Sequence, residues 1–181
     1  MRNKYLFNLI YFLTILLLFL IIDIFHIGNT LIVNYVADGD TIHFNKGVKC
    51  RLMYIDAPEN FENKKFLRDY SQCQNTTKKE LLNAGKNSTY FLRSIIKKGD
   101  QLTVKIIDTD QFNRQVCIIF KNNENINNIM IEEGYAVPYQ KFIHTKDRAF
   151  YNELVNNSKN NKKGNWDKYY DFMNCLLNIR N

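Results

Sequence analysis

The sequence predicts an α+β protein, in which a five-stranded OB-fold β-barrel carries about three α-helices and follows an N-terminal hydrophobic helix. Three observations support this class. Five short segments are rich in β-branched and aromatic residues, which favour strands. A helical pattern follows the third segment, and further helical patterns follow the fifth. This order of elements is the layout of an OB-type barrel.

The first three predicted strands are consecutive and cover residues 31–37, 42–44 and 48–55. The last two of them are joined by Asn45-Lys46-Gly47, which is typical of a tight hairpin turn. Residues 101–107 alternate between polar and apolar side chains and predict the fourth strand. Residues 115–120 predict the fifth strand.

Three helices are predicted, at residues 76–96, 125–133 and 146–159. Apolar residues recur at helical spacing in the first helix, although Gly85 weakens its middle. Residues 60–74 are polar and show no period, so we expect a loop there. Residues 167–181 extend past the predicted domain and are interpreted as an extra amphipathic helix without an assigned function.

Residues 5–22 are almost wholly apolar, and Arg2 and Lys4 precede them. About 18 apolar residues approach the length that crosses a bilayer. We interpret residues 1–28 as a membrane anchor, with a cleaved signal peptide or a buried soluble helix as alternatives. The basic residues ahead of the apolar run place the domain at residues 29–166 outside the cytoplasm, either membrane-anchored or secreted.

The chain is basic, with 25 Lys and Arg residues against 18 Asp and Glu residues and a formal net charge of +7. A basic surface favours polyanions, so nucleic acid and anionic lipid are the candidate partners. The three histidines, His26, His43 and His144, have no spacing typical of metal ligands.

Two pairs of acidic residues flank the predicted hairpin: Asp38 and Asp40 before it, Asp56 and Glu59 after it. Because a hairpin brings its ends together, we expect a small carboxylate cluster beside Arg51. Arg51 and Asp56 lie on one predicted strand at a spacing that regular alternation would put on opposite faces. A bulge or bend is therefore required between them.

Five motifs occur in order between residues 30 and 166: Asp38-Gly39-Asp40-Thr41, segment 51–59, segment 110–114, Gly134-Tyr135-Ala136 and Gly164-Asn165-Trp166. Their order and spacing resemble the staphylococcal nuclease (thermonuclease) family. The resemblance implies an OB-fold enzyme that uses Ca²⁺ to hydrolyse phosphodiester bonds of DNA and RNA. It also implies little sequence preference, 3′-phosphate products and a monomer without a protein partner.

The resemblance implies a set of metal ligands. Asp40 and Asp56 match the two carboxylates that hold one Ca²⁺, and the main-chain carbonyl of Ala57 matches a third protein ligand. Asp38 is interpreted as orienting metal-bound water. The alternative is that Asp38-Gly39-Asp40 forms only a turn.

The resemblance also implies the catalytic residues. Glu59 matches the carboxylate that positions or deprotonates the attacking water, and the sequence leaves both roles open. Arg51 and Arg114 match two arginines that grip the phosphate and stabilise its developing charge. Asn113 stands where the family usually has Gly, and Asn tolerates the left-handed conformation. The alternative for Glu59 is a surface residue of a charged loop, and Arg114 in isolation would more often be a solvated loop charge.

Two aromatic residues are candidates for substrate contact. Phe112 stands where the well-known relative has Tyr, so it keeps a stacking face but no hydroxyl. Tyr139 is interpreted as replacing a tyrosine of the family's nucleotide pocket, with an ordinary core role as the alternative.

The four cysteines allow three pairings. On regular strands Cys50 and Cys117 would both face away from the arginines, so they could meet inside the barrel. Cys73 and Cys175 would then remain for each other. Free buried thiols are the alternative.

Two other classes of function remain open. A non-catalytic OB-fold module that binds nucleic acid at the cell surface would need the arginines but not the carboxylates. A surface protein that binds only anionic lipid would leave the carboxylates without a use. If residues 5–22 stay uncleaved, the membrane is a further partner.

Overall fold

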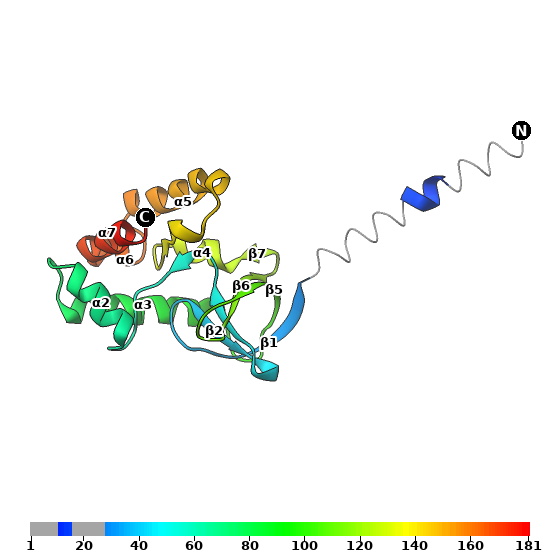
Figure 1. Ribbon diagram of the computed structural model, residues 1–181, viewed down its shortest axis with the longest axis horizontal. Helices are drawn as coiled ribbons and strands as arrows, with labels where there is room; N and C mark the ends of the chain where they lie inside the picture. The colour runs from blue at the N-terminus through cyan, green and yellow to red at the C-terminus, as the bar shows by residue number, and fades with distance from the viewer. Residues whose placement is uncertain (1–10, 16–27) are drawn as a thin grey trace, which may run out of the picture.

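The computed structural model describes residues 11–15 and 28–181 (Figure 1). Residues 11–15 are helical and their side chains are exposed. Most of the predicted anchor at residues 5–22 lies outside the described residues, as does most of segment 1–28. Within the described ranges, no helix combines the length and the hydropathy needed to cross a bilayer.

The strands close into a barrel, as predicted. β1 (Asn29–Val36), β2 (Thr41–Phe44) and β3 (Lys49–Leu52) pair in antiparallel order. On its other edge β1 pairs with β5 (Gln101–Thr109), which pairs with β6 (Gln115–Lys121). A parallel pairing of β3 with β6 closes the sheet on itself (Figure 1). The five-stranded OB-type barrel is therefore confirmed.

The barrel is filled by apolar side chains at alternating positions of its strands. The buried residues of these strands include Val33, Val36, Ile42, Phe44, Leu52, Leu102, Val104 and Ile119. The predicted hairpin turn forms η1 (Asn45–Gly47), where Lys46 and Gly47 have φ angles of 57° and 74°. Gly47 suits such a turn because Gly adopts positive φ without steric cost.

The predicted third strand is interrupted, which corrects the expectation of one strand over residues 48–55. The chain turns after β3, and Tyr54 adopts a φ of 68°. The chain then resumes as β4 (Ile55–Asp56), which pairs with β8 (Val137–Pro138) in a separate two-stranded sheet. This turn supplies the bend that the candidate site requires.

Two disulfides cross-link the fold in the predicted pairing. Cys50–Cys117 joins β3 to β6 across the seam that closes the barrel, with a sequence separation of 67 residues. Cys73–Cys175 joins the end of α2 (Lys64–Gln72) to α7 (Tyr170–Ile179). All four cysteines of the sequence are therefore paired.

Removing the disulfide at the barrel seam is expected to destabilise the protein. A Cys50→Ala, Cys117→Ala double variant should lose about 2–5 kcal/mol of unfolding free energy, because a cross-link between distant residues restricts the unfolded chain. Urea denaturation of the variant and of the parent measures the difference. Equal unfolding free energies would contradict a stabilising role for this cross-link.

The three predicted helices are confirmed as α3 (Lys78–Ile95), α4 (Ile126–Glu132) and α5 (Arg148–Asn160). α3 starts with a capping box, in which Thr77 and Glu80 satisfy each other's backbone N–H groups. The remaining short elements are β7 (Glu124–Asn125), η2 (Gln140–Phe142), η3 (Thr145–Asp147) and α6 (Asn165–Lys168).

The prediction of a loop at residues 60–74 is wrong, because this segment contains the helix α2. Asn63 caps the helix by accepting a hydrogen bond from the backbone N–H of Phe66 at 2.8 Å. The helix is mostly polar, and its buried residues are Phe66 and Asp69. A helix of nine residues with so few apolar side chains gives a weak signal in the sequence, which explains the wrong prediction.

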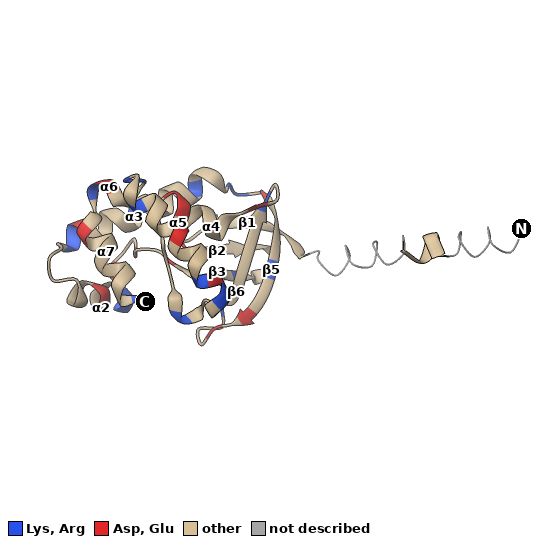
Figure 2. Ribbon diagram, turned by 90° about the horizontal axis from the view of Figure 1, so that it is seen from above, with Lys and Arg blue, Asp and Glu red and all other residues tan. Residues whose placement is uncertain are grey.

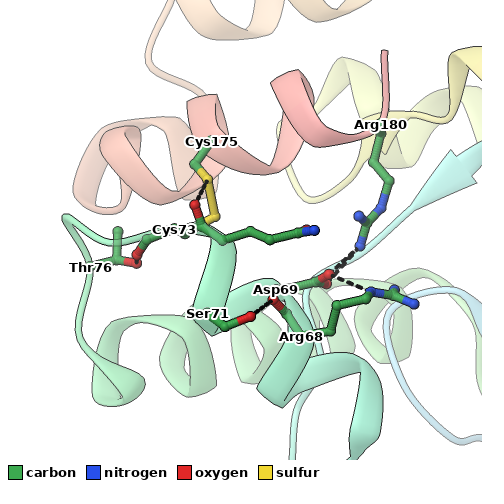
Figure 3. Close-up of a disulfide and its surroundings, with 8 residues drawn as sticks. Arg68, Asp69, Ser71, Cys73, Thr76, Cys175 and Arg180 are labelled. Atoms are coloured by element: carbon green, nitrogen blue, oxygen red, sulfur yellow. Dashed lines mark hydrogen bonds and ion pairs between the residues drawn. A yellow bond between two sulfur atoms is a disulfide. The ribbon is translucent and has the colours of Figure 1, made fainter.

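The helix expected in residues 167–181 is present as α7. It buries Phe172, Met173 and Leu176. In Figure 1 α2, α3, α6 and α7 lie together beside the barrel, and Figure 3 shows the disulfide that ties α7 to α2.

Candidate active site

The loop between β1 and β2 places Asp40 against the chain that follows β4. The backbone N–H of Asp40 donates to Asp38 Oδ1 at 3.1 Å, which closes a tight turn around Gly39. Asp40 is buried, and its Oδ2 accepts a hydrogen bond from the backbone N–H of Ala57 at 2.9 Å. The predicted meeting of the two ends of the hairpin is confirmed.

Arg51 bridges the two aspartates that the sequence singled out as metal ligands. Its Nη1 forms an ion pair with Asp40 Oδ1, and its Nη2 lies 2.6 Å from Asp56 Oδ1. Asp56 is fully buried, whereas the Arg51 side chain is 15% exposed. The bend at Tyr54 allows this contact between residues that a regular strand would separate.

Glu59 lies on the loop that leads from β4 into α2. Its Oε2 accepts a hydrogen bond from Asn63 Nδ2 at 2.6 Å, and its side chain is 12% exposed. The backbone of this loop packs directly on α3 at Gly85, where an added Cβ would lie 2.0 Å from the Glu59 carbonyl oxygen. Glycine is thus required at this position of the helix because two backbones approach closely.

A Gly85→Ala substitution is expected to displace the loop that carries Glu59. The added methyl group overlaps the Glu59 carbonyl and the Asn60 backbone nitrogen, so the backbone must move. Forcing an extra methyl group into a packed position costs about 1–3 kcal/mol of unfolding free energy. Urea denaturation compares Gly85→Ala with Lys86→Ala, which alters an exposed residue of the same helix. Equal unfolding free energies for both variants would contradict the close packing of the two backbones.

Lys65 is a site residue that the sequence analysis missed. Its Nζ lies 3.1 Å from the Ala57 carbonyl oxygen, 3.2 Å from Asp56 Oδ2 and 3.1 Å from Glu59 Oε1. The lysine lies on α2, in the segment expected to be a loop. The N-cap residue Asn63 ahead of it is the signal that could have revealed the helix.

Asp69 and Arg180 complete the site and were also missed. Arg180 Nε lies 2.9 Å from Asp56 Oδ2, and its Nη2 lies 2.6 and 2.7 Å from the two oxygens of Asp69. Figure 3 shows the paired side chains between α2 and the end of α7. We call the five acidic residues of this region the carboxylate cluster: Asp38, Asp40, Asp56, Glu59 and Asp69.

Burial and the neighbouring cations shift the pKa values of side chains in the carboxylate cluster. Burial would raise the pKa of Asp56, but Lys65, Arg51 and Arg180 together lower that pKa below its usual range. Burial acts to lower the pKa of Lys65, and the surrounding carboxylates reverse the effect and raise it. Burial raises the pKa of Asp38, although Arg51 opposes the shift.

Arg114 and Phe112 lie on the loop between β5 and β6. Arg114 forms an ion pair with Asp110, its loop neighbour, at 2.8 Å, and its charge also acts to lower the pKa of Asp38. Asn113 has a φ of 59°, which confirms the predicted left-handed conformation. Phe112 is 69% exposed, and its ring centroid lies 5.5 Å from the Arg114 guanidinium carbon. Arg114 therefore borders the cluster without joining it.

Tyr139 follows β8 and reaches the cluster through Arg180. Its ring centroid lies 5.6 Å from the Arg180 guanidinium carbon and 4.8 Å from the Phe142 ring centroid. Tyr139 is half-buried, whereas Phe142 is 54% exposed. The tyrosine thus lies between the buried cluster and an exposed aromatic side chain.

The oxygen atoms of the site suit a hard cation. Two of the three candidate ligands, Asp56 and the Ala57 carbonyl, direct one oxygen each at Lys65 Nζ, as does Glu59, so a cation is favoured at that point. The third candidate ligand, Asp40, is held by Arg51 and by the Ala57 N–H. Carboxylate and carbonyl oxygens are also the ligands that Ca²⁺ prefers. Among residues 11–15 and 28–181, no group of three or more His, Cys, Asp and Glu side chains is arranged around a metal position. The candidate ligand set, two carboxylates and a main-chain carbonyl, is smaller than such a group.

The sequence profile of the staphylococcal nuclease homologues matches residues 49–168, more than half of the chain. The chain belongs to this family. The profile covers Arg51, Asp56, Ala57, Glu59 and Arg114, which are five of the residues singled out from the sequence. The fold expected of a staphylococcal nuclease homologue, an OB-type barrel with several helices, is the one observed.

Two relatives of this staphylococcal nuclease homologue are endonucleases by name. Endonuclease YhcR of Bacillus subtilis is 30% identical over 160 residues, which are 82% of this chain and 12% of that protein. An uncharacterized endonuclease of Haemophilus influenzae is 28% identical over 120 residues, which are 64% of this chain and 56% of that protein. The chain therefore spans about an eighth of the first relative and about half of the second.

Proposed function

We propose that this chain is a Ca²⁺-dependent nuclease that hydrolyses phosphodiester bonds of DNA and RNA with little sequence preference. One observation carries the proposal: Arg51 pairs with both Asp40 and Asp56, and Lys65 joins Glu59 to Asp56 in the same cluster. Membership of the staphylococcal nuclease homologues and the names of the two relatives support the same activity.

The proposed roles of the arginines follow from their chemistry. Hydrolysis of a phosphodiester places extra negative charge on the oxygens of the phosphorus, and a guanidinium group donates several hydrogen bonds in a fixed plane. Arg51 Nη2 donates to Asp56 and to the Ile55 carbonyl, and Nη1 pairs with Asp40, which leaves Nε and one N–H of Nη1 to donate to a phosphate. Arg114, on the more exposed β5–β6 loop, would hold a second phosphate oxygen.

Glu59 is the proposed partner of the attacking water. Asn63 and Lys65 contact its two oxygens, so its carboxylate has a fixed orientation within the carboxylate cluster. The water attacks phosphorus and gives up a proton toward Glu59, while the bond from phosphorus to the 5′ oxygen breaks and that oxygen takes up a proton from solvent. The products are a 3′-phosphate end and a 5′-hydroxyl end.

Asp40, Asp56 and the carbonyl oxygen of Ala57 would hold the proposed Ca²⁺, with Asp38 orienting water beside it. When bound, the ion would supply positive charge that polarises the phosphoryl oxygen and the attacking water. Lys65 currently contacts two of these ligand residues and would have to withdraw. Its long side chain, 21% exposed, permits that movement.

Substrate contacts beyond the phosphate are proposed for two aromatic residues. Phe112 is exposed beside Arg114, and Tyr139 is half-buried beside Arg180. Aromatic faces stack on any base, which suits binding without sequence preference. Figure 2 shows basic residues on both the barrel and the helices, which supports a general attraction of polyanions.

We also propose that the domain works outside the cytoplasm, anchored by residues 5–22 or released. The two disulfides support this location because such cross-links persist in oxidising compartments.

A second candidate function is a nucleic-acid-binding module without catalysis. One observation favours it: Asp56 is fully buried, and both of its oxygens are paired with cations of the protein itself. In the binding module, this ion-pair network would hold the fold together and take no part in catalysis.

Cleavage assays separate the two candidates. Plasmid DNA and total RNA are incubated with the purified chain in Ca²⁺ or in EGTA, and the ends of the products are analysed. The nuclease proposal expects Ca²⁺-dependent cleavage of both substrates with 3′-phosphate ends. Retention of DNA by the folded chain without cleavage under either condition would favour the binding module.

A further inference from the structure

Arg180 lies beyond residues 49–168, the part of the chain that the family profile matches, yet its side chain enters the carboxylate cluster. The guanidinium group contacts Asp56 through Nε and both oxygens of Asp69 through Nη2. Arg180 is 4% exposed, so the three residues form a buried ion-pair network. A buried arginine with this geometry is held in one orientation.

The backbone around Arg180 is anchored on two sides. The carbonyl oxygen of Arg180 accepts a hydrogen bond from the backbone N–H of Gln140 at 3.0 Å. The helix that leads to it, α7, is joined to α2 by the Cys73–Cys175 disulfide (Figure 3). Because α2 also carries Asp69, the disulfide holds the arginine and its acidic partner on cross-linked helices.

Arg180 determines how Asp56 presents its oxygens. Oδ1 of Asp56 is held by Arg51, and Oδ2 is held by Arg180 and Lys65. Without Arg180, Oδ2 would depend on Lys65 alone, which is also drawn toward Asp69 at 3.3 Å. Partners that orient a ligand carboxylate typically matter by about 10- to 100-fold in activity or metal affinity.

We propose that Arg180, which directly follows α7, is a positioning residue of the active site that fixes the orientation of Asp56. The inference rests on the proposed nuclease function, in which Asp56 is a metal ligand. It makes residues 170–180 part of the site rather than an appendage to the barrel.

The first test compares the kinetics of DNA cleavage by Arg180→Gln, Arg180→Lys and the parent chain. Arg180→Gln is expected to lower kcat by about 10- to 100-fold while KM for DNA stays near the parent value, because the residue contacts Asp56 rather than substrate. Arg180→Lys keeps the charge but cannot bridge Asp56 and Asp69 with one planar group, so partial activity is expected. Lys168→Gln, which removes an exposed positive charge from α6, is the matched control and should behave like the parent.

The second test is independent of activity. The unfolding free energies of Arg180→Gln, Asp56→Asn and the double variant form a double-mutant cycle, which measures whether the two residues act on each other. Strong non-additivity is expected. Additive effects, or a folded Arg180→Gln variant with the parent's kcat, would overturn the proposal. If the parent chain cleaves nothing, the nuclease proposal fails, and the cycle still decides whether Arg180 acts on Asp56.

Discussion

A Glu59→Gln variant is expected to lose about 10²- to 10⁴-fold in the rate of phosphodiester cleavage, the usual contribution of a positioned acid or base. Glutamine keeps the size of the side chain, and its one oxygen can still accept the hydrogen bond from Asn63, which holds the loop, while the contact of Lys65 with the other oxygen is lost. The missing property is the negative charge that receives a proton from water. Gel-based cleavage of plasmid DNA, followed over time at saturating Ca²⁺, measures the loss.

Two controls make the Glu59 prediction specific. Glu62→Gln changes an exposed carboxylate of the same loop, whose partner is Lys78 on the surface, and should leave the rate unchanged. Thermal denaturation of Glu59→Gln should resemble that of the parent. A folded Glu59→Gln variant that cleaves at the parent's rate would contradict the assigned role.

An Arg51→Ala variant is expected to fail in two ways at once. Removing a donor that stabilises transition-state charge costs about 10²- to 10³-fold in rate. The same change leaves Asp40 and Asp56 buried without their shared cation, and breaking a buried ion pair costs about 3–5 kcal/mol of stability. Cleavage kinetics and urea denaturation of the same preparation measure both losses.

Arg114→Ala provides the contrast to Arg51→Ala. Arg114 pairs with Asp110 on a partly exposed loop, so its loss should reduce cleavage with little change in unfolding free energy. If Arg51→Ala keeps the parent's unfolding free energy, the ion pairs of Arg51 with Asp40 and Asp56 do not stabilise the fold. If it keeps the parent's cleavage rate, Arg51 does not act on the phosphate.

The core of the fold and half of the site could be predicted because they depend on local patterns. A hairpin brings its ends together whatever the rest of the chain does, so the approach of Asp40 to Asp56 followed from the turn at Asn45-Lys46-Gly47. The barrel followed from five short β-rich segments in a characteristic order. Regular alternation gave the wrong relation between Arg51 and Asp56, because the strand turns at Tyr54.

The other half of the site depends on contacts that no local pattern encodes. Lys65 and Asp69 lie on a helix whose buried face is partly charged, so its sequence shows polar residues where a helix usually shows apolar ones. Arg180 reaches Asp56 across 124 residues of sequence. A buried cation of this kind becomes visible only when the acidic residues it neutralises are placed in space.

We propose that the carboxylate cluster performs Ca²⁺-dependent hydrolysis and does not merely support a basic binding surface. The most direct measurement follows binding and cleavage of one labelled DNA by the parent chain as Ca²⁺ is titrated from EGTA conditions upward. We expect cleavage to begin only as the Ca²⁺ concentration rises. Binding that is present throughout, with intact DNA at every Ca²⁺ concentration, would contradict it.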